Sequence, residues 1–428
     1  MTQLAERHET YVSAFEALKR DAAFGRGALA QSRQAAFDRF LSRGLPSTRD
    51  EEWRYTNISP IATAAFERAA ASAVDAGLLK TLSFAGSSAS TIVVSNGVVV
   101  SGARTLPAGV SVRTIVDARE SDLLPVRPKG GTVFADLNQA LFEDLVVIEI
   151  APKAIVREPI HVLHVAQGGR AAALASPRLS IVAGEQSQAS VIESYATAGD
   201  AAVFVNAVTD VQVAAGAVID HVKLQRQSDA SFHLASMFVS TGRGGTFTSH
   251  AVTLGGRIAR NDIISVLDGD GAECTLNGLY VAAGESLVDT HTTIDHAQPH
   301  CPSHEVYKGI LAGRARAVFN GKIIVRLDAQ KTDAKQTNKA LLLTDDAQIN
   351  TKPQLEIFAD DVKCTHGAAI GQLDEDALFY LKARGISALE ARNMLIHAFA
   401  GDVLDGIKSE DVRLTAMRIV EEKLGLPA

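Results

Sequence analysis

Short apolar segments recur along the middle of the chain, from residue 144 to residue 357. Segments such as 146–150, 161–165 and 179–182 are four or five residues long and rich in Val, Ile and Leu, which is typical of β-strands. Turns of small residues separate these segments at intervals of about 30 residues, as in repeat proteins. The pattern therefore predicts a repeat of two or three short strands that is unbroken by helices.

Such a repeat indicates a β-solenoid, or β-helix, in which each coil buries its branched side chains against the next coil. A β-sandwich also uses short strands, but a sandwich of this length would need more hairpin turns than the segment contains. The clearest hairpin signal, Asn96-Gly97 between two apolar runs, precedes the repeat. A solenoid has two ends with unpaired edge strands. The flanking helices are candidates to cover these ends, and an uncovered end is a candidate dimer interface.

The apolar residues change to a helical spacing at both ends of the chain. Residues 3–43 predict two helices, each with one apolar face. Three further helices are predicted after residue 373. The first of these begins with acidic residues and ends with basic residues before Gly385, as the helix dipole prefers. Ser387 and Glu390 predict a capping box at the start of the second.

These patterns divide the chain into three predicted regions. Residues 1–140 form a helical and mixed N-terminal region, residues 141–372 form the β-helix core, and residues 373–428 form a C-terminal helical domain. The expected fold class is mainly β, with α-helical regions on both sides of the solenoid. Trp53, the single tryptophan, lies among alternating charges, and we interpret its segment as a brace rather than a binding anchor.

Composition and charge limit the expected partners. The 428 residues have a net charge of −7 and no basic stripe, so neither nucleic acid nor an anionic membrane is an expected partner. No apolar run reaches the ~20 residues of a membrane-spanning helix, and the polar N-terminus lacks the apolar stretch of a signal peptide. Three cysteines are too few for a disulfide framework, which indicates free thiols and a cytoplasmic location.

Common catalytic signatures are missing from the sequence. Residues 242–246 lack the Gly-Lys-Ser/Thr ending of a nucleotide-binding P-loop, and the chain contains no Gly-x-Ser-x-Gly, His-Glu-x-x-His or Cys-x-x-Cys. A β-helix polysaccharide lyase or hydrolase is an alternative class. It would need acids and bases gathered on one face of the solenoid and usually a secretion signal, and neither is evident in the sequence.

The first cluster with candidate chemistry is the pair Cys364 and His366, at the junction between the strand repeat and the C-terminal helices. Positions i and i+2 of a strand project from the same face, so these side chains should lie side by side. Thiolate and imidazole together suit iron, copper or zinc. On the spacing alone, we favour the alternative that Cys364 is a small buried residue and His366 a hydrogen-bonded residue at a strand end.

The second cluster lies in residues 291–304, which contain four of the twelve histidines and one of the three cysteines. His300, Cys301 and His304 are candidate ligands of a secondary metal site, because imidazole and thiol groups both bind transition metals. Their spacing matches no closed zinc motif. The alternative is a strand and turn whose histidines bond to backbone groups.

The segment 289–385 resembles the shared core of the SufB/SufD family, the scaffold proteins of the SUF iron–sulfur cluster assembly machinery. The blocks that carry the resemblance are 299–301, 317–321, 329–336, 341–343, 353–357, 359–367, 373–381 and 384–386. The stretch 52–56 and the modest chain length are similar to the SufD branch of the family.

The resemblance implies a right-handed parallel β-helix and a non-enzymatic scaffold subunit. It also implies that the β-helix pairs with a SufB-type subunit and that the C-terminal helices bind a SufC-type ATPase, which agrees with the missing P-loop. The residues expected to dock the ATPase are Asp374, Phe379, Tyr380, Arg384, Leu389, Met394 and Phe399.

The resemblance also gives the Cys364–His366 pair a use, because it places His366, with Cys364 beside it, near the nascent cluster at the subunit interface. No cofactor is expected to be tightly bound by this chain alone, and iron or an iron–sulfur cluster would be held transiently. A reduced flavin in the complex and a homodimer of the isolated chain stay open. The alternatives are a SufB-type paralogue that carries the cluster itself and a purely structural interaction module.

Overall fold

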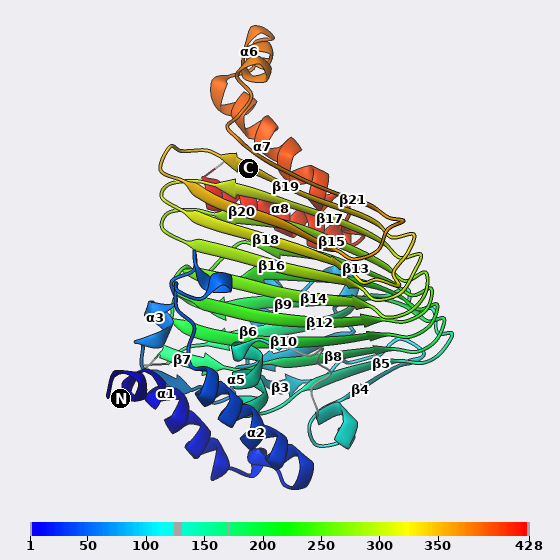
Figure 1. Ribbon diagram of the computed structural model, residues 1–428. Helices are drawn as coiled ribbons and strands as arrows, with labels where there is room; N and C mark the ends of the chain where they lie inside the picture. The colour runs from blue at the N-terminus through cyan, green and yellow to red at the C-terminus, as the bar shows by residue number, and fades with distance from the viewer. Residues whose placement is uncertain (1, 124–130, 170–171, 426–428) are drawn as a thin grey trace.

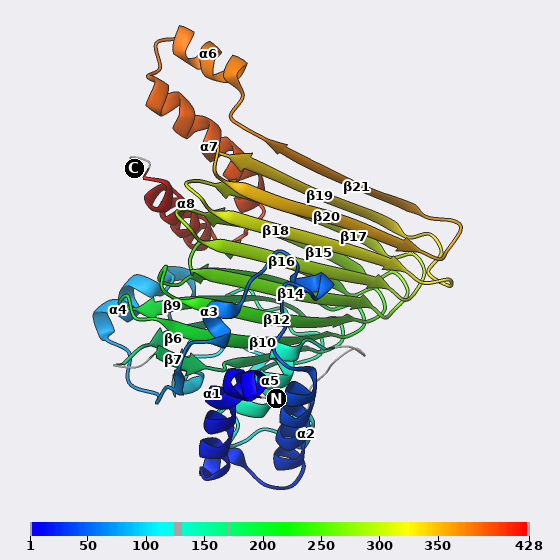
Figure 2. The same cartoon turned by 60° about the vertical axis from the view of Figure 1, so that its left-hand side comes forward.

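Two long β-sheets lie face to face and run the length of the molecule, with helices packed outside them (Figures 1 and 2). The structure is a computed structural model that describes residues 2–123, 131–169 and 172–425. The predicted β-solenoid, with helical regions before and after it, is confirmed.

Within the described residues, the first sheet has eleven strands. They are β1 (Phe66–Arg68), β4 (Val110–Arg113), β5 (Val146–Ile150), β7 (Ala172–Ala175), β8 (Arg178–Ala183), β10 (Val203–Val213), β12 (Phe232–Thr241), β14 (Ile258–Leu267), β16 (Leu287–His296), β18 (Arg316–Val325) and β20 (Gln348–Ile357).

The second sheet has ten strands in the part of the chain that the structure describes. They are β2 (Thr91–Ser95), β3 (Val98–Ser101), β6 (Ile160–Gln167), β9 (Gln188–Ala198), β11 (Val218–Arg226), β13 (Thr246–Thr253), β15 (Glu273–Ala282), β17 (Pro302–Leu311), β19 (Asp333–Leu342) and β21 (Lys363–Gly371).

From β8 onward the chain alternates between the two sheets, and each strand pairs in parallel with the strand two places later. This is the connectivity of a parallel β-helix. Two antiparallel pairs stand at its beginning, β4 with β5 and β2 with β3. The second pair is the predicted hairpin, and its turn residues Asn96 and Gly97 have positive φ values of 50° and 91°.

Alternate side chains of each strand point into the narrow space between the sheets. In-register parallel strands place equivalent side chains of successive coils in columns, about 4.8 Å apart. We name two columns of the second sheet after their last members. The His366 column contains His221, Ser249, Leu276, Glu305, Gln336 and His366. The Cys364 column contains Phe247, Cys274, Ser303, Ala334 and Cys364.

The N-terminal helices pack on the outer face of the first sheet. Aromatic side chains of α1 (Thr2–Lys19) and α2 (Gly27–Arg43), together with α5 (Val133–Leu141), form one apolar cluster with Phe204 and Phe232 of the sheet. The two predicted N-terminal helices are therefore confirmed. The remaining short helices of this region are η1 (Ala22–Phe24), η2 (Glu51–Trp53), α3 (Ser59–Ala62), α4 (Ala76–Leu82), η3 (Ala85–Ser87) and η4 (Glu120–Leu123).

The C-terminal helices are α6 (Glu375–Ala383), α7 (Ala388–Leu404) and α8 (Glu410–Leu424), and the predicted capping box of α7 is present. They were candidates to cover the end of the solenoid, but they do not. Apolar residues of α7 and α8 pack on the outer face of the second sheet, because they match the apolar outer residues of β15 and β17. Helix α6 and the start of α7 project away from the sheets (Figure 2).

The predicted division of the chain into three regions at residues 140 and 372 stays a prediction. Strands β2 and β3, which belong to the predicted N-terminal region, extend the second sheet. No helix within the described ranges is long and apolar enough to cross a membrane.

Candidate functional site

The last coil of the solenoid, which we call the open end, consists of β20 and β21. Among the described residues, β20 pairs only with β18, and β21 pairs only with β19, so each has one free edge. No residue of either strand is buried, whereas seven of the ten residues of β17, two coils before β21 in the same sheet, are buried. Free parallel edges offer backbone donors and acceptors to another chain.

Cys364 and His366 lie on β21, the last strand of its sheet, as the sequence predicts. Cys364 is half-buried and packs against the apolar cluster around Ala334, so this face of β21 points into the interior. His366 follows two residues later on the same face and is exposed, because no further coil covers it. The structure therefore places the pair together at the open end.

Burial raises the pKa of the Cys364 thiol, and the backbone N–H of Ala334 only partly opposes this effect. The thiol is therefore mainly protonated near neutral pH. A metal ion bound there would have to displace the proton, since the thiolate is the ligand.

Beneath His366, the same column holds a buried polar pair that the sequence analysis did not identify. The Gln336 Nε2 atom donates a hydrogen bond of 2.7 Å to Glu305 Oε2, and both side chains are buried. Burial raises the pKa of Glu305 to about 7. No local signal identifies this pair, because residues 335–339 are all polar and Glu305 lies on the preceding coil, 31 residues earlier.

A cluster of polar side chains around Glu193 lies deeper in the interior of the solenoid. Glu193 is fully buried and accepts hydrogen bonds from His221 Nε2 at 2.9 Å and Thr209 Oγ1 at 2.7 Å. Burial alone would raise the pKa of Glu193, but the hydrogen bond and charge of His221, with Lys223, hold it below its usual range. These groups satisfy one another, so we assign them a structural role.

The candidate secondary site of His300, Cys301 and His304 is not brought together. His300 is exposed in a turn, and Cys301 is fully buried in the interior, where its thiol donates to the Pro299 carbonyl at 3.3 Å. His304 lies on the opposite, outer face of β17 from the interior residue Glu305. No three His, Cys, Asp or Glu side chains converge as a metal site anywhere in the described ranges.

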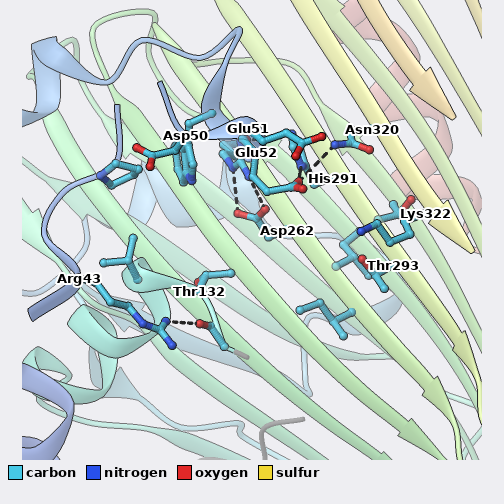
Figure 3. A pocket seen from close by; sticks show the side chains of 18 of the residues that line it. Arg43, Asp50, Glu51, Glu52, Thr132, Asp262, His291, Thr293, Asn320 and Lys322 are labelled. Atoms are coloured by element: carbon cyan, nitrogen blue, oxygen red, sulfur yellow. Dashed lines mark hydrogen bonds and ion pairs between the residues drawn. The ribbon is translucent and has the colours of Figure 1, made fainter. Parts of the chain in front are cut away.

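The N-terminal segment 46–56, which we call the strap, crosses the outer face of the first sheet beside a pocket of about 560 Å³ (Figure 3). Trp53 is buried, with the Arg260 guanidinium 3.8 Å from its ring centre. The Thr56 hydroxyl donates to the buried carboxylate of Asp289 at 2.6 Å, and Arg260 donates to the same oxygen at 2.6 Å. These contacts fix the strap to β14 and β16.

Charged and polar side chains pair with one another at the edge of the same pocket. Glu52, His291 and Asn320 point toward one another, with 3.1 Å between His291 Nδ1 and Glu52 Oε2 (Figure 3). Burial disfavours the charged form of His291, but Asp289, 3.0 Å from it, raises its pKa to about 9. His291 is therefore charged at neutral pH. Because these groups pair with one another, the geometry supports the predicted bracing role of the Trp53 segment.

The C-terminal helices expose an apolar patch, which we define as Phe379 and Tyr380 of α6 with Leu389 and Met394 of α7. Phe379 is 72% exposed, and exposed apolar groups gathered in a patch can mark a site of protein–protein interaction. Other residues predicted to dock the ATPase have local contacts.

Asp374 caps α6, Arg384 lies over the Tyr380 ring, and Phe399 packs beneath Lys308. The docking role of all these residues stays a prediction.

Comparison with known proteins identifies the family. Residues 164–399 match the SufBD core domain of SUF system iron–sulfur cluster assembly, and residues 5–162 match the SufBD protein N-terminal region. The chain belongs to the SufB/SufD family. Together the two matched regions include the strap, all coils of the solenoid and most of α7.

Individual family members match along most of their length. The iron–sulfur cluster assembly protein SufD of Escherichia coli is 31% identical over 394 residues, which cover 91% of this chain and 92% of that protein. An iron–sulfur cluster assembly SufBD family protein of Synechocystis is 33% identical over 396 residues, 89% of this chain and 87% of the relative. The chain is therefore a SufD-like member of the SufB/SufD family, as its resemblance predicts.

Proposed function

We propose that this SufD-like chain is a non-enzymatic scaffold subunit of a SUF complex. In this proposal the open end pairs with a SufB-type subunit, and His366, with Cys364, supplies ligands for iron or a nascent cluster at the interface. The main support for this proposal is that a thiol and an imidazole lie on one face of β21 at the open end. Two donors from one strand leave coordination positions for ligands from a second chain. The iron or cluster is then cargo that can be passed on.

The unpaired strands of the open end support the proposed pairing with a SufB-type subunit. The free edges of β20 and β21 can continue both sheets into a second solenoid through backbone hydrogen bonds. Large apolar side chains beside these edges add surface that a partner would bury, namely Leu327, Ile357, Phe358 and Ile370.

The apolar patch on α6 and α7 supports a second contact, with a SufC-type ATPase. Helix α6 contacts α7 and projects beyond the sheets, so a partner can reach both helices (Figure 2). The ATPase would supply the nucleotide hydrolysis for which this sequence has no P-loop. In this role the chain would act in the cytoplasm, where its three thiols stay reduced.

Anaerobic reconstitution of the complex of this chain with its SufB-type and SufC-type partners tests the proposal. His366→Ala should assemble normally but lower the cluster yield, measured by visible absorption, several-fold. His304→Ala is the matched control, because this histidine lies in the same sheet on the outer face. Equal yields from wild type and His366→Ala would refute the ligand role. Failure of the wild-type chain to bind either partner would refute the scaffold role.

A further inference from the structure

Gln336 occupies the position directly beneath His366 in the His366 column. In-register neighbours of parallel strands are about 4.8 Å apart at the backbone, so the two side chains are adjacent in the column. The Gln336 amide is 2% exposed and reaches across the interior toward the first sheet. A buried amide therefore lies under an exposed imidazole.

The orientation of this amide is set from below. Its Nε2 atom donates to Glu305 Oε2 at 2.7 Å, which leaves Oε1 as the remaining polar end. Within the described part of the chain, this buried oxygen has no hydrogen-bond donor. Leaving a buried carbonyl oxygen without a donor is costly, so a nearby N–H is expected to satisfy it.

A glycine on the facing sheet makes room for the amide. A Cβ atom at Gly321 of β18 would lie 2.1 Å from Gln336 Nε2 and 3.0 Å from Oε1, and the other close atom is also from the Gln336 side chain. Gly321 is thus required for the observed place of the amide. It also offers a way to displace the amide without altering Gln336 or His366.

We propose that Gln336 is the positioning residue of His366, accepting a hydrogen bond at Oε1 from one ring N–H of the imidazole. This inference rests on the proposed role of His366 as a ligand. A neutral imidazole that donates from one nitrogen presents the lone pair of the other. Since the Gln336 amide lies on the interior side, the free nitrogen faces outward, toward a metal ion held at the open end. Ligand histidines generally donate their second N–H to such an acceptor.

The proposal is tested by measuring which tautomer His366 adopts in the full chain, from the ¹⁵N NMR chemical shifts of its two ring nitrogens. The chain is labelled with ¹⁵N-histidine and measured at pH 8.5, and the His366 signals are assigned by their loss in His366→Ala. We expect wild type to hold one tautomer. Gln336→Leu should change the tautomer ratio by about fivefold, the factor that one hydrogen bond typically contributes.

Gly321→Ala should produce the same change while Gln336 remains present, because only the tip of a flexible side chain has to move. This variant also keeps the test decisive if Gln336→Leu does not fold. Gln354→Leu is the matched control, since Gln354 lies on the neighbouring edge strand beside Leu355, which faces the interior. An unchanged ratio in the Gly321→Ala variant would overturn the positioning role.

Cluster yield separates this inference from the function on which it rests. If His366 is a ligand, reconstituted complexes with Gln336→Leu should show a several-fold lower yield. A shifted tautomer ratio with an unchanged yield in His366→Ala would reject the ligand function and retain the hydrogen bond. A lower yield in His366→Ala with an unchanged ratio in Gly321→Ala would retain the function and reject the hydrogen bond.

Discussion

The interior of the solenoid and its open end hold the same pair of chemical groups in different surroundings. His221 and His366 belong to one column, and Cys274 and Cys364 belong to the next. His221 is fully buried between Glu193 and the Ser249 hydroxyl, whereas His366 is exposed.

The cysteines differ in the same way. Burial raises the pKa of Cys274 to about 12, and this thiol has no exposed surface. Cys364 is only half-buried. The comparison shows that the repeat places the groups, and that the presence or absence of a following coil decides whether their side chains are buried or accessible to solvent.

The largest expected difference is between the two histidines. His221→Ala would leave the buried carboxylate of Glu193 without its imidazole partner, which should cost about 3–5 kcal/mol of unfolding free energy. His366→Ala removes an exposed side chain and the single hydrogen bond proposed for it, so it should lower the free energy of unfolding by no more than about 1 kcal/mol. Urea unfolding of both variants measures the difference. Similar losses in the two would show that the open end is as structural as the interior.

Glu305, between these histidines in the column, gives a pH-dependent prediction. Its pKa is about 7 in the folded chain and ~4.3 when unfolded, so the folded state binds the proton more tightly and stability falls as pH rises between these values. Glu305→Gln removes this penalty and should stabilise the chain by about 3 kcal/mol at pH 8. The gain should shrink to about 1 kcal/mol at pH 5.

Urea unfolding at the two pH values measures this gain. The same gain at both would mean that the Glu305 carboxyl is not the titrating group.

A smaller loss of stability is expected for a substitution in the strap, on the outer face of the first sheet. Thr56→Val keeps the shape of the side chain but removes its hydrogen bond to the buried carboxylate of Asp289. Because hydrogen bonds to charged groups are stronger than neutral ones, the loss should be about 2 kcal/mol. Thermal unfolding checks this value, with Thr48→Val in the same segment as the control. Equal melting temperatures for the two variants would contradict the bracing role of this bond.

The smallest stability effect is expected at the apolar patch. Phe379→Ala should leave the unfolding free energy within about 0.5 kcal/mol of wild type, because the ring is 72% exposed. The same variant should weaken binding of the SufC-type ATPase, which titration calorimetry can measure. Unaltered ATPase binding in a Phe379→Ala, Met394→Ala double variant would remove the patch from the proposed interface.

The strand repeat was predictable because its signals are local. Val and Ile runs and glycine turns recur within each coil, and capping signals such as Ser387 with Glu390 lie a few residues apart. The side-by-side placement of Cys364 and His366 also follows from the geometry of a single strand. Their exposure required knowing that the C-terminal helices leave the last coil uncovered.

Other features depend on residues that are distant in sequence. The contact between Trp53 and Arg260 joins the strap to β14, and the bond from Gln336 to Glu305 joins two coils. Neither partner can be named from its own segment. The candidate cluster of His300, Cys301 and His304 shows the converse, because residues that are close in sequence can still point in different directions: Cys301 is buried in the interior, whereas His304 lies on the outer face of β17.

The central claim is that the open end is where this chain meets its SufB-type partner. Alkylation of the three cysteines with a maleimide, read by mass spectrometry, tests it directly in the isolated chain and in the reconstituted complex. Cys274 and Cys301 should react slowly in both, because both are fully buried. Cys364 should react fastest in the isolated chain and become strongly protected in the complex. Equal reaction of Cys364 with and without the partner would contradict the account.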